Sequence, residues 1–375
     1  MMKVLVICKR QYTGRDLLDD SYGRLYEIPE ALAQAGHQVR GLTCSYRARP
    51  EGYVRRGNVP WQSLNAVPIG PGAIKYLKRL WMEVEDFRPD LVWASSDMWH
   101  GIACGWVCSR LAVPYVIDLY DNYESFLLSR LPGTRTLFRR ACQHATGTTS
   151  VSERLSQHLQ GSYGLPNEQI LTLGNATTPS LFFPMEQSWA REQLGLPQDR
   201  ILIGTAGALG ASRGTKVLLE AIPLLRQYIP ELELVLAGPR EPSLKLPNHP
   251  YIRYLGELPP SQVSCVYNAL DLSIICNRDS AFGAYCYPQK LNEILACTTR
   301  LLAADVGELA NLLGHAPKHL FNATSAASLT EKARELLQSP RSSPLQPIYW
   351  QQRAAEIACF FESRLQAIRD NGTFR

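Results

Sequence analysis

The chain contains two series of continuous apolar segments, each long enough for a β-strand and each followed by a segment with helical periodicity. KVLVIC (3–8) opens the first series and ILIGTAG (201–207) opens the second. Strands that are apolar on every residue, rather than on alternate residues, are typical of parallel sheets covered by helices on both faces. We therefore predict an α/β protein with two Rossmann-like, doubly wound parallel-sheet domains.

The residue ranges of the two series define the expected domains. The first series predicts strands over 3–8, 38–44, 91–95, 115–120, 145–151 and 169–173, and the second over 201–207, 232–238, 251–256, 270–276 and 300–305. Helices are expected near 22–35, 73–86, 101–112, 134–144, 213–228, 288–297 and 325–338. Residues 348–368 have apolar side chains at helical spacing and predict a closing helix. The expected domains are 1–180, 181–345 and a C-terminal segment, 346–375, that packs back toward the first domain.

Ligands of such sheets bind in the loops that follow the carboxyl ends of the strands, so we expect the chemistry in a central cleft that both sheets face. No GxGxxG follows either first strand, and no GxxxxGK[ST] occurs in the chain. The dinucleotide and NTPase fingerprints are therefore missing.

The segment CNRDSAFGAYCYPQKLNEILAC (276–297) leaves an apolar strand and enters a helix expected to start at Pro288. Proline suits the first helical position, and the N–H groups of Gln289 and Lys290 together with the Lys290 ammonium predict a phosphate seat. Glu293, one turn further on, is placed to accept hydrogen bonds from the hydroxyls of a ribose. The alternative is an ordinary solvated helix start.

The segment GTAGALGASRGTKVLLEAI (204–222) runs from a strand through small residues into a helix. Small residues let a ligand approach the backbone closely, and Arg213 and Lys216 at the helix start are suited to neutralising a departing diphosphate. Two cations at a helix start oppose the macrodipole, which argues against a purely structural role. That structural role remains the alternative.

The segment YVIDLYDNYES (115–125) ends a strand with Asp118, Tyr120 and Asp121, which we expect to face the cleft. Asp121 is the preferred residue to hydrogen-bond a donor-sugar or acceptor hydroxyl, and capping of the following turn is the alternative. His100, in SSDMWHG (95–101), is a candidate base at another strand end, with packing beside Trp99 as the alternative. The expected catalytic residues are Asp121, Tyr120 and His100.

Composition excludes several classes of protein. The net charge is only +5, and residues 1–180 carry 20 Lys and Arg against 16 Asp and Glu, which is too even for a nucleic-acid-binding protein. The ten cysteines include no CxxC pair, so we expect structural thiols in a reducing compartment. The apolar run after Lys3 is too short for a signal peptide, and no stretch approaches the ~18 apolar residues of a membrane span. The expected location is cytoplasmic, with peripheral attachment to the inner membrane face as an option.

Taken in order, these segments resemble the retaining GT-B glycosyltransferases of family 4 over nearly the whole chain. RLYEIPEALAQAGHQV (24–39), GALGASRGTKVLLEA (207–221), YNALDLSIIC (267–276) and PQKLNEILAC (288–297) carry the resemblance. It implies that Glu293 matches the second glutamate of the family's E-x7-E pattern and that Arg213 matches the phosphate-loop lysine. The chain departs from the family pattern at Tyr285, Ala208 and Tyr120. The donor-binding residues expected on this basis are Gly14, Arg213, Lys216, Tyr285, Gln289, Lys290, Leu291 and Glu293.

The resemblance implies transfer of a sugar from a nucleotide sugar, a UDP- or GDP-sugar, to a glycan or lipid-linked acceptor with retention of configuration. Neither a metal nor another cofactor is expected. The three departures keep two alternatives open: a catalytically weakened partner subunit that binds nucleotide sugar, and a GT-B-like nucleotide-sugar epimerase.

Three basic clusters in the first half predict contact with an anionic membrane surface. Each lies beside aromatic or apolar residues, and a solvated basic face is the alternative. The clusters are Arg47, Arg49, Arg55 and Arg56 in an expected loop, Lys75, Lys78 and Arg79 in an amphipathic stretch, and Arg135, Arg139 and Arg140.

Overall fold

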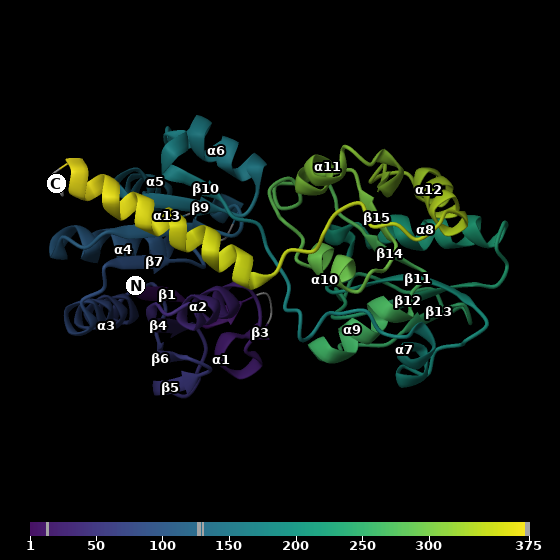
Figure 1. Cartoon of the computed structure of the whole chain (residues 1–375), viewed down its shortest axis with the longest axis horizontal. Helices are drawn as coiled ribbons and strands as arrows, with labels where there is room; N and C mark the ends of the chain where they lie inside the picture. Colours follow the sequence, from purple (N-terminus) through teal and green to yellow (C-terminus); the bar gives the residue numbers. More distant parts are fainter. Residues whose placement is uncertain (13–14, 126–128, 130, 372–375) are drawn as a thin grey trace. The chain divides into compact units, whose positions relative to one another are not determined.

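The computed structural model describes residues 1–12, 15–125, 129 and 131–371 and divides the chain into two compact units (Figure 1). Unit 1 comprises Met1–Gly174 together with Trp350–Arg375, and unit 2 comprises Asn175–Tyr349. The chain thus passes between units at Gly174 and at Tyr349, near the boundaries expected at 180 and 345. The last helix, α13 (Trp350–Asn371), belongs to unit 1.

Unit 1 is built on an eight-stranded sheet with the order β10-β9-β8-β7-β1-β4-β6-β5, parallel except for β5. Every residue of β7 and β8 is buried, as is expected of central parallel strands covered on both faces. Two short strands, β2 (Gln11–Tyr12) and β3 (Arg15–Asp16), form a separate antiparallel pair. The strands of the large sheet are β1 (Lys3–Lys9), β4 (Gln38–Ser45), β5 (Gly52–Arg56), β6 (Val59–Asn65), β7 (Leu91–Ala94), β8 (Tyr115–Leu119), β9 (Gly147–Ser150) and β10 (Ile170–Thr172).

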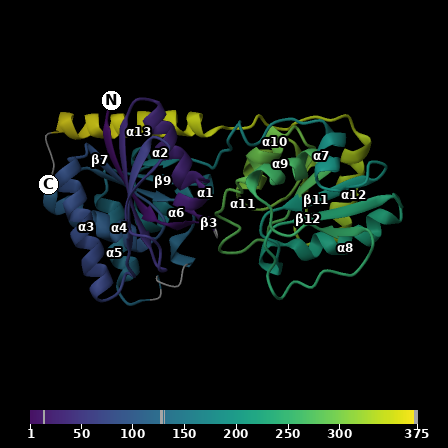
Figure 2. The same ribbon diagram turned by 90° about the horizontal axis from the view of Figure 1, so that it is seen from below.

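Helices cover both faces of this sheet, with α2 and α13 on one face and α3, α4 and α5 on the other (Figure 2). On α13, the buried residues Ile357, Phe361 and Leu365 follow the spacing that predicted the closing helix, and α13 packs against α2. The other helices of unit 1 are α1 (Leu17–Asp20), α2 (Arg24–Gln34), α3 (Pro71–Phe87), α4 (Met98–Leu111), α5 (Thr134–His144) and α6 (Glu153–Tyr163).

Unit 2 is built on a six-stranded, fully parallel sheet with the order β13-β12-β11-β14-β15-β16. Its core packs leucines and isoleucines of β11, β12 and β14 against α8 and α12. The strands are β11 (Ile201–Ala206), β12 (Leu232–Ala237), β13 (Ile252–Tyr254), β14 (Leu272–Ile275), β15 (Leu301–Ala304) and β16 (Leu320–Phe321). The helices are α7 (Gln187–Gln193), α8 (Thr215–Arg226), α9 (Pro260–Ala269), α10 (Lys290–Ala296), α11 (Gly307–Leu313) and α12 (Ala326–Gln338).

The structure confirms the predicted fold class and corrects two local predictions. Arg55 and Arg56 lie on β5, an edge strand paired with β6, and not in a loop. Alternate residues of β5 are exposed, and charged side chains are tolerated on such an edge. The helix expected over 288–297 is shorter: α10 begins at Lys290 and has seven residues.

Candidate functional site

In unit 2 the direction of the strand order reverses between β11 and β14, because β12 and β13 lie on one side of β11 and β14, β15 and β16 lie on the other. In open α/β sheets, ligands bind at this reversal, outside the carboxyl ends of the strands. Two loops leave the sheet there. We call residues 207–214, after β11, the phosphate loop, and residues 276–289, after β14, the donor loop.

Close backbone contacts hold the two loops together. A Cβ on Gly214, whose φ is +78°, would lie 2.9 Å from the carbonyl oxygen of Asn277, so this position needs glycine for both its conformation and its space. Arg278 Nη1 also donates to the carbonyl oxygen of Ala211 at 3.2 Å. The phosphate loop and the donor loop therefore form one surface.

Lys290, at the start of α10, reaches back under the phosphate loop. A Cβ added to Gly207, whose φ is +106°, would lie 3.2 Å from Lys290 Nζ. Burial of the ammonium lowers the Lys290 pKa, and the nearby charge of Arg213 lowers it further, against the opposing effect of Glu293. The Arg213 guanidinium stacks on the ring of Phe282 in the donor loop at 4.0 Å. The structure thus brings together the two cations that the sequence assigned to a diphosphate.

Glu293 is buried on α10, and its two carboxylate oxygens accept hydrogen bonds from different side chains. Tyr267 Oη donates to Oε2 at 3.3 Å, and Gln289 Nε2 donates to Oε1 at 3.1 Å. Burial and the neighbouring Glu293 charge raise the pKa of Tyr267 well above its ordinary value, so Tyr267 stays a donor at neutral pH. These two donors fix the orientation of the carboxylate beside Lys290.

Other residues expected to bind the donor are less well placed to contact a ligand. Lys216 is exposed and pairs with Glu220 one turn along α8, at 3.5 Å. The Leu291 side chain is fully buried in the core, and its N–H donates to the carbonyl oxygen of Pro288 at 3.1 Å. Tyr285 is partly buried in the donor loop, and Gly14 lies outside the described residues.

The helix α10 begins two residues after Pro288, where the sequence placed the helix start. Asn292 N–H donates to the carbonyl oxygen of Gln289 at 3.1 Å, so this amide of the first turn already has a partner. A seven-residue helix also has a small macrodipole. Lys290 and Arg213 are side-chain cations that the two loops bring to this end of the sheet.

In unit 1 the strand order reverses between β1 and β7, and the chain is strained there. Ser96, which follows β7, is buried with a φ of +100°, a region that non-glycine residues rarely adopt. Three hydrogen bonds hold it: Lys9 N–H donates to Ser96 Oγ at 2.8 Å, Ser96 N–H donates to Tyr123 Oη at 3.0 Å, and Tyr120 Oη donates to the Ser96 carbonyl oxygen at 3.1 Å. Strained backbone of this kind concentrates at functional sites.

The next residue, Asp97, is the centre of a buried network that the sequence did not predict. Tyr46 Oη donates to Asp97 Oδ2 at 2.7 Å, and His100 Nδ1 lies 2.7 Å from Asp97 Oδ1. Burial alone would raise the pKa of Asp97, but His100, Tyr46 and Lys9 together lower it to about 2. Asp97 is therefore an ionised, buried carboxylate at the strand reversal.

His100, a candidate base, is fully buried on the first turn of α4 and lies edge-on to Tyr76, with ring centroids 5.4 Å apart. Its Nε2 has no hydrogen-bond partner among the described residues. A packing role for His100 explains these contacts at least as well as a role as a catalytic base does.

The three residues at the end of β8 differ in burial and in their partners. Asp118 does not face a cleft: it is fully buried and pairs with the buried Arg24 at 2.6 Å, because a charge inside this core needs a compensating partner. Asp121 is buried, and its Oδ1 accepts the N–H of Asn122 at 2.7 Å, as expected of a turn-capping side chain. Tyr120 is partly exposed beside Ser96.

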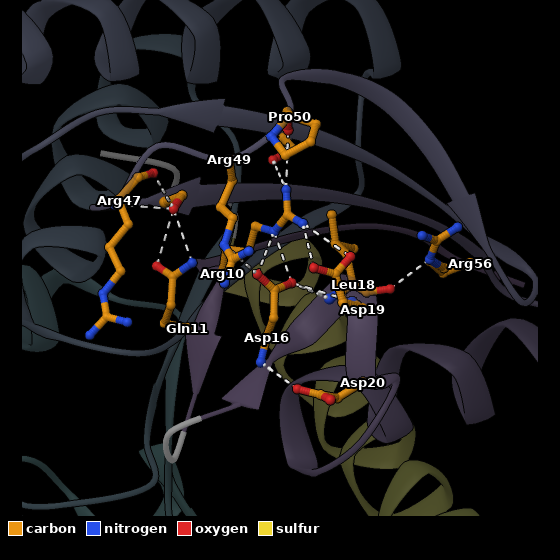
Figure 3. Close-up of polar contacts among 12 residues, drawn as sticks. Arg10, Gln11, Asp16, Leu18, Asp19, Asp20, Arg47, Arg49, Pro50 and Arg56 are labelled. Carbon is orange, nitrogen blue, oxygen red and sulfur yellow. Dashed lines mark hydrogen bonds and ion pairs between the residues drawn. The ribbon is translucent and has the colours of Figure 1, made fainter.

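The first basic cluster surrounds a buried arginine (Figure 3). Arg10 Nε contacts Asp16 at 2.8 Å, and Arg49 lies 3.4 Å from the same carboxylate. Arg56 Nε donates to the Leu18 carbonyl oxygen at 2.6 Å. Cations of the other clusters also pair within the chain, including Lys75 with Glu51, Arg79 with Glu83 and Arg139 with Glu124. Much of the predicted basic surface is thus neutralised locally.

Two further features concern the described part of the chain. No helix there is long and apolar enough to cross a membrane. No group of three or more His, Cys, Asp or Glu side chains there is arranged to hold a metal ion.

Comparison with known proteins assigns both units to related domains. Residues 24–176 match the glycosyl transferase 4-like domain, and residues 200–339 match the domain of the glycosyl transferases group 1. A protein named as a teichuronic acid biosynthesis glycosyltransferase, TuaC of Bacillus subtilis, is 28% identical over 305 residues, which cover 78% of this chain and 75% of TuaC. The D-inositol 3-phosphate glycosyltransferase of Thermobispora bispora is 25% identical over 327 residues, 78% of this chain and 75% of that protein.

Solved structures share the fold at low sequence identity. Sucrose-phosphate synthase of Thermosynechococcus elongatus has a TM-score of 0.69 at 17% identity, covering 99% of this chain and 98% of that chain. Anabaena HepE in complex with UDP-glucose has a TM-score of 0.68 at 15% identity, covering 99% of both chains.

Proposed function

Because the chain belongs to the group 1 glycosyltransferases and has their GT-B fold, we propose that it transfers a sugar from a nucleotide sugar to a glycan or lipid-linked acceptor with retention of anomeric configuration. The proposed role is in polysaccharide or glycoconjugate synthesis. The observation that carries this proposal is the meeting of Lys290, Arg213 and Glu293 at the strand reversal of unit 2.

The donor diphosphate binds between the phosphate loop and the donor loop. Lys290 and Arg213 neutralise its charge. The lowered Lys290 pKa supports this role, because it reflects burial of the ammonium first and repulsion by the nearby Arg213 second. A diphosphate relieves that repulsion. Negative charge on the diphosphate grows as the sugar leaves, so fixed cations stabilise the transition state more than the bound donor.

Glu293 accepts hydrogen bonds from the ribose hydroxyls of the donor. Its carboxylate is already oriented by Tyr267 and Gln289, so little conformational freedom is lost on binding. UDP is the first nucleotide to test because the similarly folded HepE is described with UDP and with UDP-glucose. A GDP-sugar is the second candidate.

No covalent enzyme nucleophile is required. The leaving diphosphate takes the proton of the acceptor hydroxyl on the same face of the sugar, and the new glycosidic bond forms on that face. The chain contributes by positioning the donor and by stabilising charge on the leaving group.

Unit 1 binds the acceptor. The strained Ser96 and the buried Asp97 network give the strand reversal of unit 1 a rigid frame, and the partly exposed Tyr120 and the buried Asp121 directly follow the adjacent strand β8. TuaC and the D-inositol 3-phosphate glycosyltransferases take their names from anionic products or substrates. Anionic acceptors are therefore the first class to test.

Product analysis separates this function from the two alternatives. The chain is incubated with UDP-, GDP- and ADP-sugars, with and without anionic glycan acceptors, and the products are identified by mass spectrometry. Acceptor-dependent release of nucleoside diphosphate supports a transferase. Binding without turnover indicates a weakened partner subunit, and conversion of the free donor sugar indicates an epimerase.

We also propose that the protein is cytoplasmic and docks on an anionic inner membrane face through α3, α4 and α5. These helices lie on the same face of the unit 1 sheet (Figure 2) and expose Ile74 (69%), Leu137 (52%) and Trp106 (44%). The exposed cations Lys78 and Arg140 lie on the same helices. Apolar side chains bordered by cations favour an anionic bilayer, by about 1 kcal/mol for each cation near the surface.

Sedimentation with vesicles tests the docking surface. We expect binding to anionic vesicles at low salt, weaker binding at high salt, and loss of binding in Ile74→Asp. Absence of binding at low salt, or equal binding to neutral vesicles, would contradict the proposed docking.

A further inference from the structure

A carboxylate from the neighbouring loop lies on the phosphate loop. The segment after β12 runs beside the phosphate loop, and Leu209 forms an isolated parallel bridge with Arg240. Leu209 N–H donates to the Pro239 carbonyl oxygen and Glu241 N–H donates to the Leu209 carbonyl oxygen, both at 2.8 Å. These bonds fix the backbone of Glu241 beside Gly210.

The Glu241 side chain binds the polar groups of the phosphate loop. The hydroxyl of Ser212 donates to Glu241 Oε1, and the backbone N–H groups of Ser212 and Ala211 lie near enough to the carboxylate to lower its pKa. A Cβ on Gly210 would overlap the Glu241 carboxyl group, so the loop has space for the carboxylate only because this residue is glycine. The Ser212 hydroxyl, these N–H groups and the nearby Arg213 charge hold the pKa of Glu241 below its ordinary value.

The groups that bind Glu241 are those that recognise a phosphate. Successive backbone N–H groups and a hydroxyl bind carboxylate and phosphate oxygens by the same charge-assisted hydrogen bonds, and the nearby Arg213 charge attracts either anion. Glu241 is only partly buried, and its contact with Ser212 is exposed, so its side chain has room to turn into solvent.

We propose that Glu241 is an internal competitor of the donor diphosphate, occupying the anion-binding groups of the phosphate loop until the donor displaces it. This inference rests on the proposed function, because it takes the phosphate loop as part of the donor site. The carboxylate keeps Ala211 and Ser212 ordered while the site is empty of donor. The carboxylate also sets the affinity of the phosphate loop for anions, because only a ligand with more negative charge than one carboxylate displaces Glu241 effectively.

Calorimetric titration with UDP and with inorganic pyrophosphate tests the competition in wild type and in Glu241→Gln. Glutamine has nearly the same shape but is a neutral and weaker acceptor, so both ligands are expected to bind the variant about three- to tenfold more tightly. Glu220→Gln is the matched control. It removes the same charge from the exposed pair with Lys216 on the adjoining helix and is expected to leave both affinities unchanged.

Binding that is equal or weaker in Glu241→Gln, while wild type binds UDP, would overturn the inference and leave the proposed function standing. Failure of both proteins to bind UDP, GDP or pyrophosphate would overturn both. Glu241→Ala provides a second variant, because it removes the carboxyl group completely. It is expected to bind pyrophosphate more tightly than wild type, and unchanged pyrophosphate affinity in both variants would also refute the competition.

Discussion

Replacing Lys290 by methionine separates binding from stability. Methionine keeps the unbranched apolar stem that packs beside Gly207 but removes the ammonium. In the native protein that ammonium is desolvated and repelled by Arg213, which is why its pKa is lowered. The substitution should therefore leave the fold at least as stable at pH 7 while weakening the binding of a diphosphate.

The size of the effect follows from the type of bond that is lost. A hydrogen bond to a charged group contributes about 1.5–3 kcal/mol, so loss of the Lys290 contact should raise the Kd for UDP roughly ten- to a hundredfold. The expected effect of the substitution on the free energy of unfolding has the opposite sign to its effect on binding. A lysine with a lowered folded pKa is protonated less readily in the native state, so wild-type stability should rise as the pH increases from that lowered pKa toward the unfolded value of about 10.4. Lys290→Met should lack this rise.

The assay is calorimetric titration of UDP, combined with chemical unfolding at pH 7 and in the alkaline range. Lys216→Met is the matched control, because Lys216 is exposed and paired with Glu220, and its loss should change the Kd less than about threefold. Unchanged UDP affinity in Lys290→Met, or equal losses in both variants, would refute the assignment of Lys290 to the diphosphate.

Three further substitutions test other parts of the structure. Glu293→Gln should weaken UDP binding by about tenfold but leave pyrophosphate binding unchanged, as measured by calorimetry, because the carboxylate is assigned to the ribose. Arg24→Leu should lower the free energy of unfolding by about 3–5 kcal/mol, since it leaves Asp118 charged and buried without a partner; a loss below about 1 kcal/mol in urea unfolding would contradict this. Asp97→Asn should cost about 2 kcal/mol at pH 7. The folded pKa of Asp97 is about 2 and lies below the unfolded value of about 3.9, so its contribution is present above pH 4 and is lost as the pH falls through 2. The difference in unfolding free energy between wild type and Asp97→Asn should therefore shrink in acid.

The fold was largely predictable because parallel sheets leave a strong sequence pattern. Strand β1 has an unbroken apolar run from Val4 to Cys8, and β12 is apolar except for Glu233. The family resemblance inferred from the sequence is confirmed by matches in both units. The β5–β6 hairpin was missed because β5 lies at the sheet edge and ends in two consecutive arginines after Tyr53 and Val54, a pattern that resembles a basic loop.

Some residues of the proposed site could be named from the sequence and others could not, for equally physical reasons. Lys290 and Glu293 follow a buried strand at helical spacing, so sequence and structure agree on their placement. The Asp97 network was missed because Tyr46 lies 51 residues away in the chain and meets Asp97 only when β4 and β7 flank β1. The position of Asp97 directly after an apolar strand was the available signal. Glu241 was missed because its loop has no periodic pattern.

The most direct measurement is the stereochemistry and acceptor dependence of sugar transfer. Purified protein is incubated with α-linked UDP- and GDP-sugars and anionic glycan acceptors, and the anomeric proton of the product is followed by NMR. We expect nucleoside diphosphate to be released only when an acceptor is present, a product with α-configuration, and loss of both in Lys290→Met. A β-linked product, donor conversion without an acceptor, or equal turnover by Lys290→Met would contradict the proposed function.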